Sequence, residues 1–362
     1  MTFSDVANAS AGPHARLPDV LRSDSGAVIG EPGQWPARRE EIAARLLPLV
    51  YGALPPTPKR TDCDLLHATT VRQLGGAQLL SCRVKPLGMA SFTLRVFVPT
   101  GTGPCPVMLD GDGCWLNAGE AVIAAVLARE MVFAQFNRVD IAPDPQVSNG
   151  GPAPHAALAS WAWGYHRAID ALLQISEQRS SPAWARVDPL RIAVVGHSRG
   201  GKAALLAGAT DTRIALTSAN NSGAGGAGSW RWLGPGAESL ADITRAFPHW
   251  FAPALQQFAG REQGLPFDQH FLKALIAPRA LLTTEALGDA WANPQGSWLT
   301  HRAAQPVYDL LGVPDRLAQA WRPGEHAHTL ADWHTLLDFS DTVFRGHTMA
   351  PGLDQNPFPE LL

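Results

Sequence analysis

Hydrophobic and polar positions along the chain follow two different rhythms. Residues 68–99 alternate apolar and polar side chains, with Leu94, Val96 and Val98 in one run, which predicts antiparallel strands. From residue 106 onward, short apolar runs alternate with longer helical segments. Such alternation is typical of a mostly parallel sheet that is covered by helices on both faces, so we expect the α/β class.

The individual elements follow from the length and period of each run. The predicted strands beyond residue 100 cover 106–109, 131–135, 191–195, 214–218 and 280–284. The predicted helices cover 38–51, 121–129, 157–177, 202–209 and 335–344. Residues 1–30 are rich in Ala, Ser, Gly and Pro without periodicity, and we expect a loose N-terminal arm there. No linker divides the remainder, so residues 31–362 are expected to form a single domain.

Composition narrows the possible partners. The 362 residues carry 29 Lys and Arg against 32 Asp and Glu, a net charge of −3 with no basic cluster, which argues against nucleic-acid binding. Apolar runs such as 121–128 are far shorter than the roughly 20 residues of a membrane span. We expect a monomer that binds neither nucleic acid nor membrane. The first 25 residues show no features of a signal peptide, and the cellular location stays open.

A nucleophile motif interrupts the βα pattern at residue 196. The predicted strand 191–195 runs into Gly196-His197-Ser198-Arg199-Gly200, and a helix follows. This is the G-x-S-x-G elbow in the strand-turn-helix context that it requires. The tight turn leaves no room for a Cβ two positions before or after the serine, and Ser198 is lifted out at the helix N-terminus. We therefore predict that Ser198 is a nucleophile.

Two phosphate-binding motifs compete for this region. Residues 196–203 match a P-loop except that Ala203 replaces the Ser or Thr that would hold Mg²⁺. Residues 223–228 match G-x-G-x-x-G, but neither a clean helix nor an acidic residue about 20 positions on follows them. Neither match supports nucleotide binding, and no cofactor is expected.

A serine nucleophile needs a base and an orienting acid, in the chain order Ser, acid, His. Asp289 follows the predicted strand 280–284, and His326 comes later, so both fit this order. Spacing alone leaves Glu285 and His328 as alternatives for the same roles. The neighbouring histidines and Asp332 show no distinctive metal-ligand spacing, and no metal is expected. The four cysteines also lack the spacing of metal ligands, and they could be free thiols or form two disulfides. They are Cys63, Cys82, Cys105 and Cys114.

Several long strings then resemble the glucuronoyl esterases, carbohydrate esterase family 15. The similar segments are 195–209, 218–226, 247–251, 265–270, 274–279, 289–294 and 323–326. The likeness covers roughly residues 35–345 and implies an α/β-hydrolase fold. It also implies cleavage of esters between 4-O-methyl-glucuronic acid on xylan and lignin alcohols. A uronic-acid ester or a glucuronoxylan-type carbohydrate is then the expected substrate.

The resemblance assigns roles residue by residue. Ser198, Asp289 and His326 match the catalytic triad of the bacterial pattern, and His326 is favoured over His328 by its Gly-x-His context. Arg199 matches an arginine that contributes to the oxyanion hole. The residues that match sugar contacts are Lys202, Glu238 and Trp291.

Two positions depart from the fungal members. Those enzymes place the triad glutamate where Asn221 stands here, and an amide cannot stabilise an imidazolium by charge, so the role falls to Asp289. They also carry a cysteine before the serine, where this chain has His197, so a disulfide from that position is impossible. We predict a serine esterase that acts on glucuronate esters through an acyl-enzyme. The alternatives are a carbohydrate esterase for another acyl group, such as acetyl-xylan, and a non-catalytic carbohydrate-binding descendant.

Overall fold

The computed structural model describes residues 17–115, 118–145, 155–178 and 186–361, and these residues contain one nine-stranded sheet. Its strands are β1 (Thr61–Val71), β2 (Ala77–Pro86), β3 (Phe92–Val98), β4 (Cys105–Asp110), β5 (Val132–Phe136), β6 (Val187–His197), β7 (Ile214–Asn220), β8 (Ala280–Ala286) and β9 (Leu317–Arg322). Their order is β1-β2-β3-β5-β4-β6-β7-β8-β9. The first three pairs in this order, β1–β2, β2–β3 and β3–β5, are antiparallel. Every later pair, from β5–β4 to β8–β9, is parallel.

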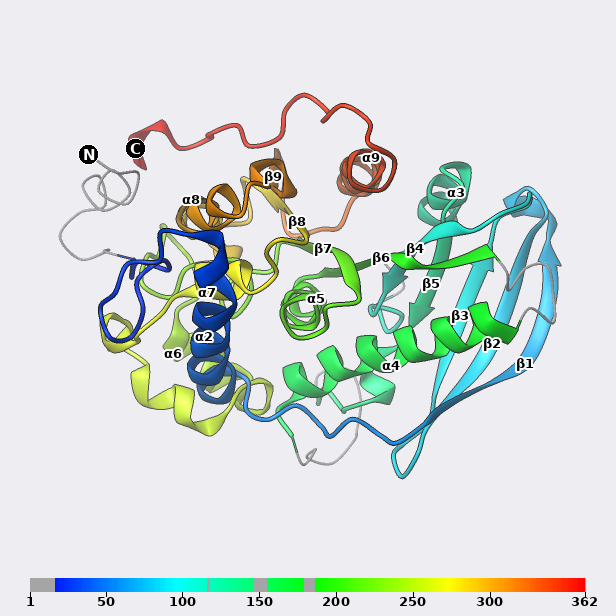
Figure 1. Cartoon of the computed structure of the whole chain (residues 1–362), viewed down its shortest axis with the longest axis horizontal. Helices are drawn as coiled ribbons and strands as arrows, with labels where there is room; N and C mark the ends of the chain where they lie inside the picture. The colour runs from blue at the N-terminus through cyan, green and yellow to red at the C-terminus, as the bar shows by residue number, and fades with distance from the viewer. Residues whose placement is uncertain (1–16, 116–117, 146–154, 179–185, 362) are drawn as a thin grey trace.

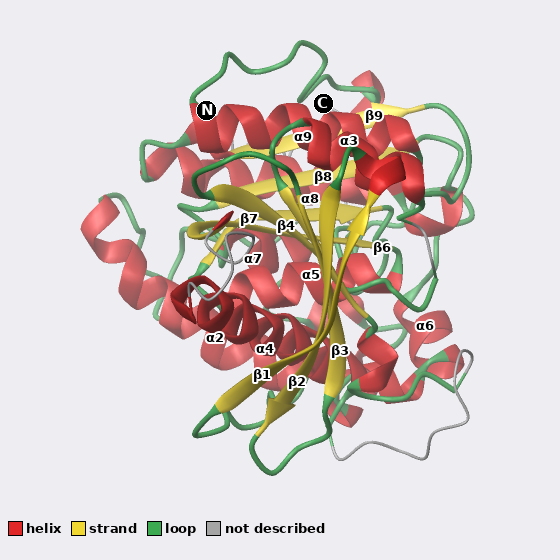
Figure 2. Ribbon diagram, turned by 90° about the vertical axis from the view of Figure 1, so that its right-hand side faces the viewer, coloured by secondary structure: helices red, strands yellow, loops and turns green. Residues whose placement is uncertain are grey.

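Helices cover both faces of this twisted sheet (Figures 1 and 2). They are α2 (Trp35–Val50), α3 (Glu120–Ala128), α4 (Ala157–Gln178), α5 (Arg199–Thr210), α6 (Leu240–Ala246), α7 (Gln269–Ala274), α8 (Pro294–Leu310) and α9 (Leu330–Arg345). Helices α3 and α9 lie on one face, whereas α4 and α5 lie on the other. Because side chains alternate along a strand, Val194 of β6 joins the core that contains α4 and α5, and Val195 joins the core beneath α9. The α/β class and the helix-covered, mostly parallel sheet are thus confirmed.

Every strand predicted beyond residue 100 coincides with an observed strand, but strand β9 and the helices α6, α7 and α8 were not predicted. Helix α8 contains Pro306, and an interior proline normally indicates a helix end. Strand β9 is buried only over its first three residues, so its apolar run is short. Strand β1 also begins at Thr61, earlier than predicted, because Asp64 to Thr70 are exposed at the sheet edge and show no one-sided burial.

The N-terminal segment is described from residue 17 onward, and the first 16 residues of the predicted arm lie outside the described residues. Val20 is buried in the main core, and its carbonyl accepts a hydrogen bond of 3.1 Å from Arg38 Nε on α2. These contacts attach Val20 to the rest of the chain, within the segment 1–30 for which a loose arm was predicted. The single sheet spans residues 61–322 and supports our proposal of one domain for residues 31–362.

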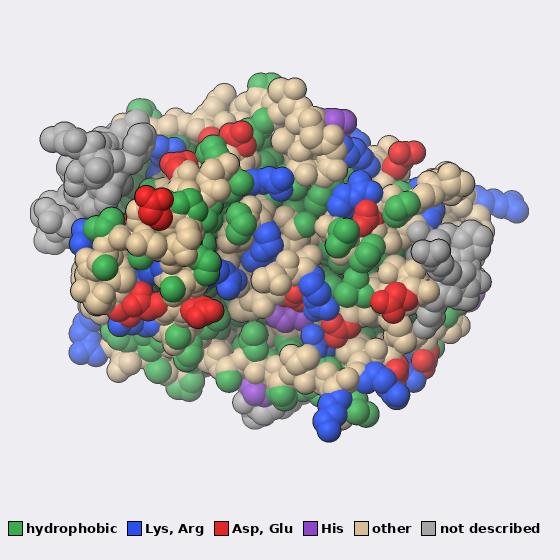
Figure 3. Space-filling view, viewed as in Figure 1, with side chains coloured by type: hydrophobic (Ala, Val, Ile, Leu, Met, Phe, Trp, Pro, Cys, Tyr) green, Lys and Arg blue, Asp and Glu red, His purple; other side chains and the backbone are tan. Residues whose placement is uncertain are grey.

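Other expectations concern the surface and the cysteines. None of the helices in the described parts of the chain combines the length and apolarity that a membrane span needs. On the face drawn in Figure 3, acidic and basic side chains are interspersed rather than gathered by sign. All four cysteines are free thiols, which decides between the two states that the sequence left open.

Candidate active site

The turn between β6 and α5 places Ser198 in a backbone conformation that side chains seldom adopt. Its φ is +56° and its ψ is −122°, at the N-terminal end of α5. A Cβ on Gly196 would collide with the backbone of Gly200, so the turn tolerates only glycine there. The Ser198 N–H donates a hydrogen bond of 2.8 Å to the Asn220 carbonyl of the neighbouring strand β7. The local fold thus holds the serine at the carboxyl ends of the parallel strands.

His326 reaches Ser198 from the loop after β9. Its Nε2 lies 2.9 Å from Ser198 Oγ, and its Nδ1 lies 2.5 Å from Asp289 Oδ2. A carboxylate can only accept, so Nδ1 carries the proton and Nε2 presents a lone pair to the serine hydroxyl. Asp289 is almost fully buried, and it also caps the short 3₁₀ helix Ala290–Ala292 by accepting from the Ala292 N–H. The His326 side chain is 43% exposed, so a substrate can approach it from solvent.

The two alternatives for the acid and the base point elsewhere. Glu285 is buried and its Oε1 accepts a hydrogen bond of 2.6 Å from Ser297 Oγ. Burial raises the pKa of Glu285 to about 8, so at neutral pH this group is largely uncharged. His328 stacks between His197 and Trp333, and burial holds its pKa well below the usual range. Neither residue makes a hydrogen bond with Ser198 or His326 among those of the described residues.

Arg199 is fixed directly beside Ser198. Its Nη1 lies 2.8 Å from Oδ2 of the buried Asp144. The guanidinium also lies over three aromatic rings, at 4.7 Å from Trp250, 5.2 Å from Phe247 and 5.3 Å from Trp115. A cation held in this way needs no reorganisation when negative charge develops nearby.

The three predicted sugar contacts lie close together: Lys202 is one helical turn beyond the serine on α5, and Glu238 interacts with both Lys202 and Trp291. Lys202 is buried, and its Nζ donates a hydrogen bond of 2.5 Å to the Ser222 carbonyl. Burial lowers the pKa of Lys202 to about 8, although the nearby Glu238 opposes that shift. Burial likewise raises the pKa of Glu238, against the effects of Lys202 and of a hydrogen bond from Trp291. The Trp291 ring is 54% exposed, so this group offers both buried charge and an open aromatic face.

The two segments that match phosphate-binding motifs lie at the serine turn and in the loop after β7. Residues 196–203 are the serine turn itself, and no helix follows residues 223–228 until α6 begins at Leu240. Within the described residues, no three His, Cys, Asp or Glu side chains are grouped so that they could hold a metal ion.

Comparison with known proteins assigns the family. The sequence matches the family model described as glucuronyl esterase, fungi, over residues 85–312, which is more than half of the chain. The chain belongs to the glucuronoyl esterase family. It is accordingly a carboxylic ester hydrolase, and the resemblance found in the sequence is confirmed.

Relatives of this family come from fungi and bacteria. The chain is 30% identical to 4-O-methyl-glucuronoyl methylesterase 1 of Wolfiporia cocos, with 86% of this chain and 76% of that protein covered. It is 39% identical to carbohydrate esterase MZ0003 from an unknown prokaryotic organism, with 92% and 91% covered. The solved family 15 glucuronoyl esterase of Caldicellulosiruptor kristjansonii is 30% identical and superimposes with a TM-score of 0.81, covering 97% of each chain.

Sequence reasoning missed one residue that supports the serine turn of this glucuronoyl esterase. Asp112 is buried, and its Oδ2 accepts a hydrogen bond of 2.7 Å from the His197 N–H, while its other oxygen pairs with the buried Arg138. Asp110 lies next to it, and burial, followed by the charge of Asp112, raises the pKa of Asp110 to about 7. The signal was the Asp-Gly-Asp-Gly string at the carboxyl end of the buried strand β4.

Proposed function

We propose that this enzyme hydrolyses esters of glucuronic acid or 4-O-methyl-glucuronic acid through a Ser198-His326-Asp289 triad and an acyl-enzyme. The observation that carries the proposal is the continuous hydrogen-bonded path from Ser198 through His326 to the buried Asp289. The substrate class follows from the family and from relatives named as 4-O-methyl-glucuronoyl methylesterases.

Acylation uses the lone pair of His326 Nε2. It takes the Ser198 proton as Oγ attacks the C6 carbonyl of the uronate ester. The developing oxyanion is stabilised by the Arg199 guanidinium and by a backbone N–H at the start of α5. A guanidinium has five N–H donors, so it can hold Asp144 and a developing negative charge together. His326 then returns the proton to the departing alcohol.

Deacylation repeats these steps with water as the nucleophile. His326 removes a proton from the water, which attacks the acyl-enzyme, and Ser198 leaves as the free hydroxyl. The product is a uronic acid. Throughout both steps Asp289 keeps the imidazole in the required tautomer and stabilises the imidazolium that forms. Where the sugar binds, Lys202 and Glu238 supply polar groups that hydrogen-bond to its hydroxyls, and Trp291 offers a ring that packs on the sugar face.

The decisive experiment compares benzyl glucuronate with an acetyl ester for the wild type and Ser198→Ala. Turnover of the uronate ester that vanishes in Ser198→Ala supports both the triad and the substrate class. Turnover of the acetyl ester alone would retain the nucleophile and overturn the substrate. If neither ester is cleaved and a fluorophosphonate probe does not label Ser198, the proposal of a serine esterase is wrong.

A further inference from the structure

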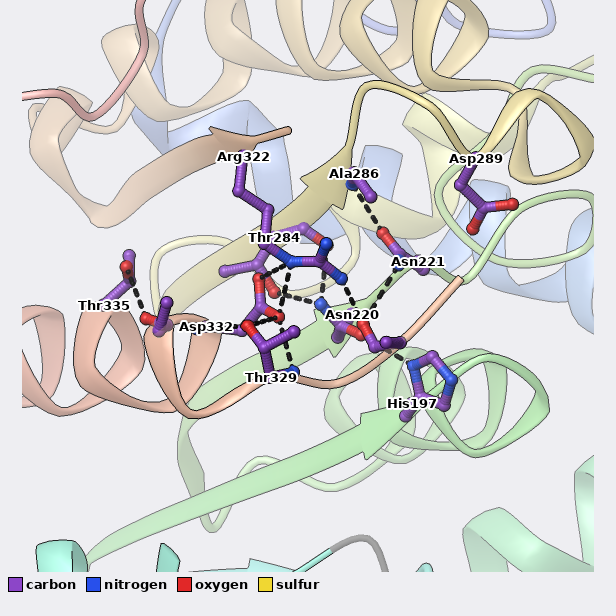
Figure 4. A network of polar contacts seen from close by, with 12 residues as sticks. His197, Asn220, Asn221, Thr284, Ala286, Asp289, Arg322, Thr329, Asp332 and Thr335 are labelled. Atoms are coloured by element: carbon purple, nitrogen blue, oxygen red, sulfur yellow. Dashed lines mark hydrogen bonds and ion pairs between the residues drawn. The ribbon is translucent and has the colours of Figure 1, made fainter. Parts of the chain in front are cut away.

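One buried amide joins the two loops that carry the acid and the base. Asn221 directly follows β7, has a φ of +44° and is almost completely buried. Its Oδ1 accepts a hydrogen bond of 2.7 Å from the Ala286 N–H, and its Nδ2 donates one of 3.3 Å to the Ala327 carbonyl. Figure 4 shows this side chain lying between the end of β8 and the segment after β9.

Each of the two bonds ends close to a proposed triad member. Ala286 is the last residue of β8, three positions before Asp289, and Ala327 is the immediate neighbour of His326. We propose that Asn221 is a positioning residue, which sets the Asp289 loop and the His326 loop at the spacing that proton transfer requires. This inference rests on the proposed triad and adds to it a residue that touches neither substrate nor the reacting atoms.

The chemistry of the bridge requires an amide. One end of the side chain must accept from an N–H and the other must donate to a carbonyl, and a primary amide does both without charge. A carboxylate could still accept from Ala286, but it would face the Ala327 carbonyl with no hydrogen to donate. The left-handed backbone at this position is also one that Asn tolerates better than most residues.

Other contacts of the His326 loop meet the Asn221 bridge at the Ala327 carbonyl. The Ala327 carbonyl also accepts from the Arg322 guanidinium, which pairs with Asp332 on α9. Arg322 lies on β9 beside Ala286 of β8, and its carbonyl accepts from the Leu287 N–H, so the backbone also joins the ends of β8 and β9. Asn221 supplies a side-chain link from the Ala327 carbonyl across to the end of β8.

The charged and titratable groups around this bridge are few. His326 faces Asp289 and the ring of His197, and Arg322 faces the loop from β9. Burial lowers the pKa of His197, and this group stays neutral near pH 7. A carboxylate introduced at residue 221 would therefore add a negative charge beside the imidazole, close to the Arg322 guanidinium that shares the Ala327 carbonyl.

The test uses the full chain and two variants, Asn221→Asp and Asn221→Gly. The Asp variant keeps the shape and the acceptor but loses the donor, whereas Gly removes both bonds and suits the positive φ, so it protects against a folding failure. We expect kcat for benzyl glucuronate to fall about 10- to 100-fold in both, since small misplacements of catalytic groups cost that much. KM should stay within about twofold, because uniform binding is untouched.

The Asp variant adds a second readout that loss of packing would not produce. Its extra negative charge stabilises the His326 imidazolium, so the acid limb of the kcat/KM profile should move to higher pH than in the Gly variant. A matched control is Gln269→Glu on α7. The buried amide of Gln269 donates a hydrogen bond of 2.8 Å to the Gly226 carbonyl and accepts one of 3.0 Å from Trp230 Nε1, and neither partner belongs to the Asp289 loop or the His326 loop. It should lose thermal stability like Asn221→Asp while kcat stays at the wild-type value.

Two outcomes would overturn the inference. One is a wild-type kcat in both Asn221 variants. The other is a loss of kcat in Gln269→Glu that equals the loss in Asn221→Asp at equal loss of Tm. The rate of Ser198 labelling by a fluorophosphonate probe separates this result from a failure of the proposed substrate. That rate depends on the aligned triad but not on the sugar, so the Asn221 variants should label more slowly even if the wild type does not cleave uronate esters.

Discussion

The ring of His197 lies against the ring of His326, with the centroids 4.7 Å apart and the planes inclined by 44°. On the His328 side, the His197 ring stacks with the His328 ring at 5.8 Å, and His328 stacks on Trp333 at 4.8 Å. His197 Nδ1 donates a hydrogen bond of 2.6 Å to Asn220 Oδ1. Burial first, and then the neighbouring His326, lower the pKa of His197. The proposed base is therefore flanked by a neutral ring, which does not oppose the positive charge that His326 would gain in the proposed mechanism.

This contact predicts different results for two substitutions of His197. His197→Phe keeps a ring against His326, whereas His197→Ala leaves a gap into which the base can shift. We expect kcat to fall about tenfold or more in the Ala variant and by a smaller factor in the Phe variant. Steady-state kinetics on benzyl glucuronate at pH 7 checks this. Equal losses of kcat in both variants would show that the hydrogen bond to Asn220, and not the ring contact, is what matters.

The choice of triad acid gives a sharper contrast. Asp289→Asn keeps the shape but removes the charge, and kcat should fall on the order of 10³- to 10⁴-fold. Glu285→Gln should cost less than about tenfold, because the raised pKa of about 8 already leaves this buried carboxyl largely neutral at pH 7. The comparison of kcat for these two variants is the measurement. A larger loss in Glu285→Gln than in Asp289→Asn would move the role of the acid to Glu285.

The parts of the site that the sequence predicted are those with a local signature. Ser198 lies in a five-residue motif with the expected flanks, and Asp289 and His326 follow from chain order after a predicted strand. Spacing did not distinguish Asp289 from Glu285, because only the three-dimensional structure shows that Glu285 turns into the interior towards Ser297. Most of the fold was predictable for the same reason, since every buried strand of the parallel region except β9 is a compact apolar run.

The contacts of the supporting residues could not be found in this way. Asn221 and Ala327 are 106 residues apart, and Asp112 and His197 are 85 apart, and each pair meets through a backbone group that any residue type possesses. The Asp-Gly-Asp-Gly string is a signal for Asp112 itself, but no sequence pattern shows which backbone group such a side chain contacts. Helix α8 was missed for a different reason, because Pro306 lies inside a helix that tertiary packing nevertheless stabilises.

The buried Lys202 predicts a pH dependence of substrate binding. Its pKa of about 8 means that the ammonium is present below pH 8 and is lost above it. KM for a uronate ester should therefore rise between pH 8 and pH 9, whereas Lys202→Arg, whose guanidinium stays charged, should show no such rise. Kinetics over this range is the measurement, and a KM for the wild type that stays flat would contradict the assigned contact.

The same shift has a consequence for stability. The folded-state pKa of Lys202 lies below the usual 10.5, so between pH 8 and pH 10.5 the unfolded chain binds the extra proton more readily. The free energy of unfolding should then rise with pH in this window relative to that of Lys202→Met. Urea unfolding at pH 7 and pH 10 measures the difference. An equal pH dependence in both proteins would mean that Lys202 titrates normally.

The serine turn predicts a large difference between two glycine substitutions. A Cβ on Gly200 would meet the carboxylate of Asp112, which holds the His197 N–H and pairs with the buried Arg138. Displacing one partner of a buried ion pair costs roughly 3–5 kcal/mol, so Gly200→Ala should lower the free energy of unfolding by about that amount.

Gly33 provides the matched control for that prediction. It lies in the 3₁₀ helix Pro32–Gln34, where an added Cβ meets nothing within 4 Å, and its φ is not in the left-handed region. Gly33→Ala should therefore change the free energy of unfolding by less than about 1 kcal/mol, and in the stabilising direction, because the unfolded chain loses freedom. Denaturant unfolding of both variants decides the matter. If Gly200→Ala is as stable as Gly33→Ala, the Asp112 carboxylate can move aside, and it does not lock the turn that presents Ser198.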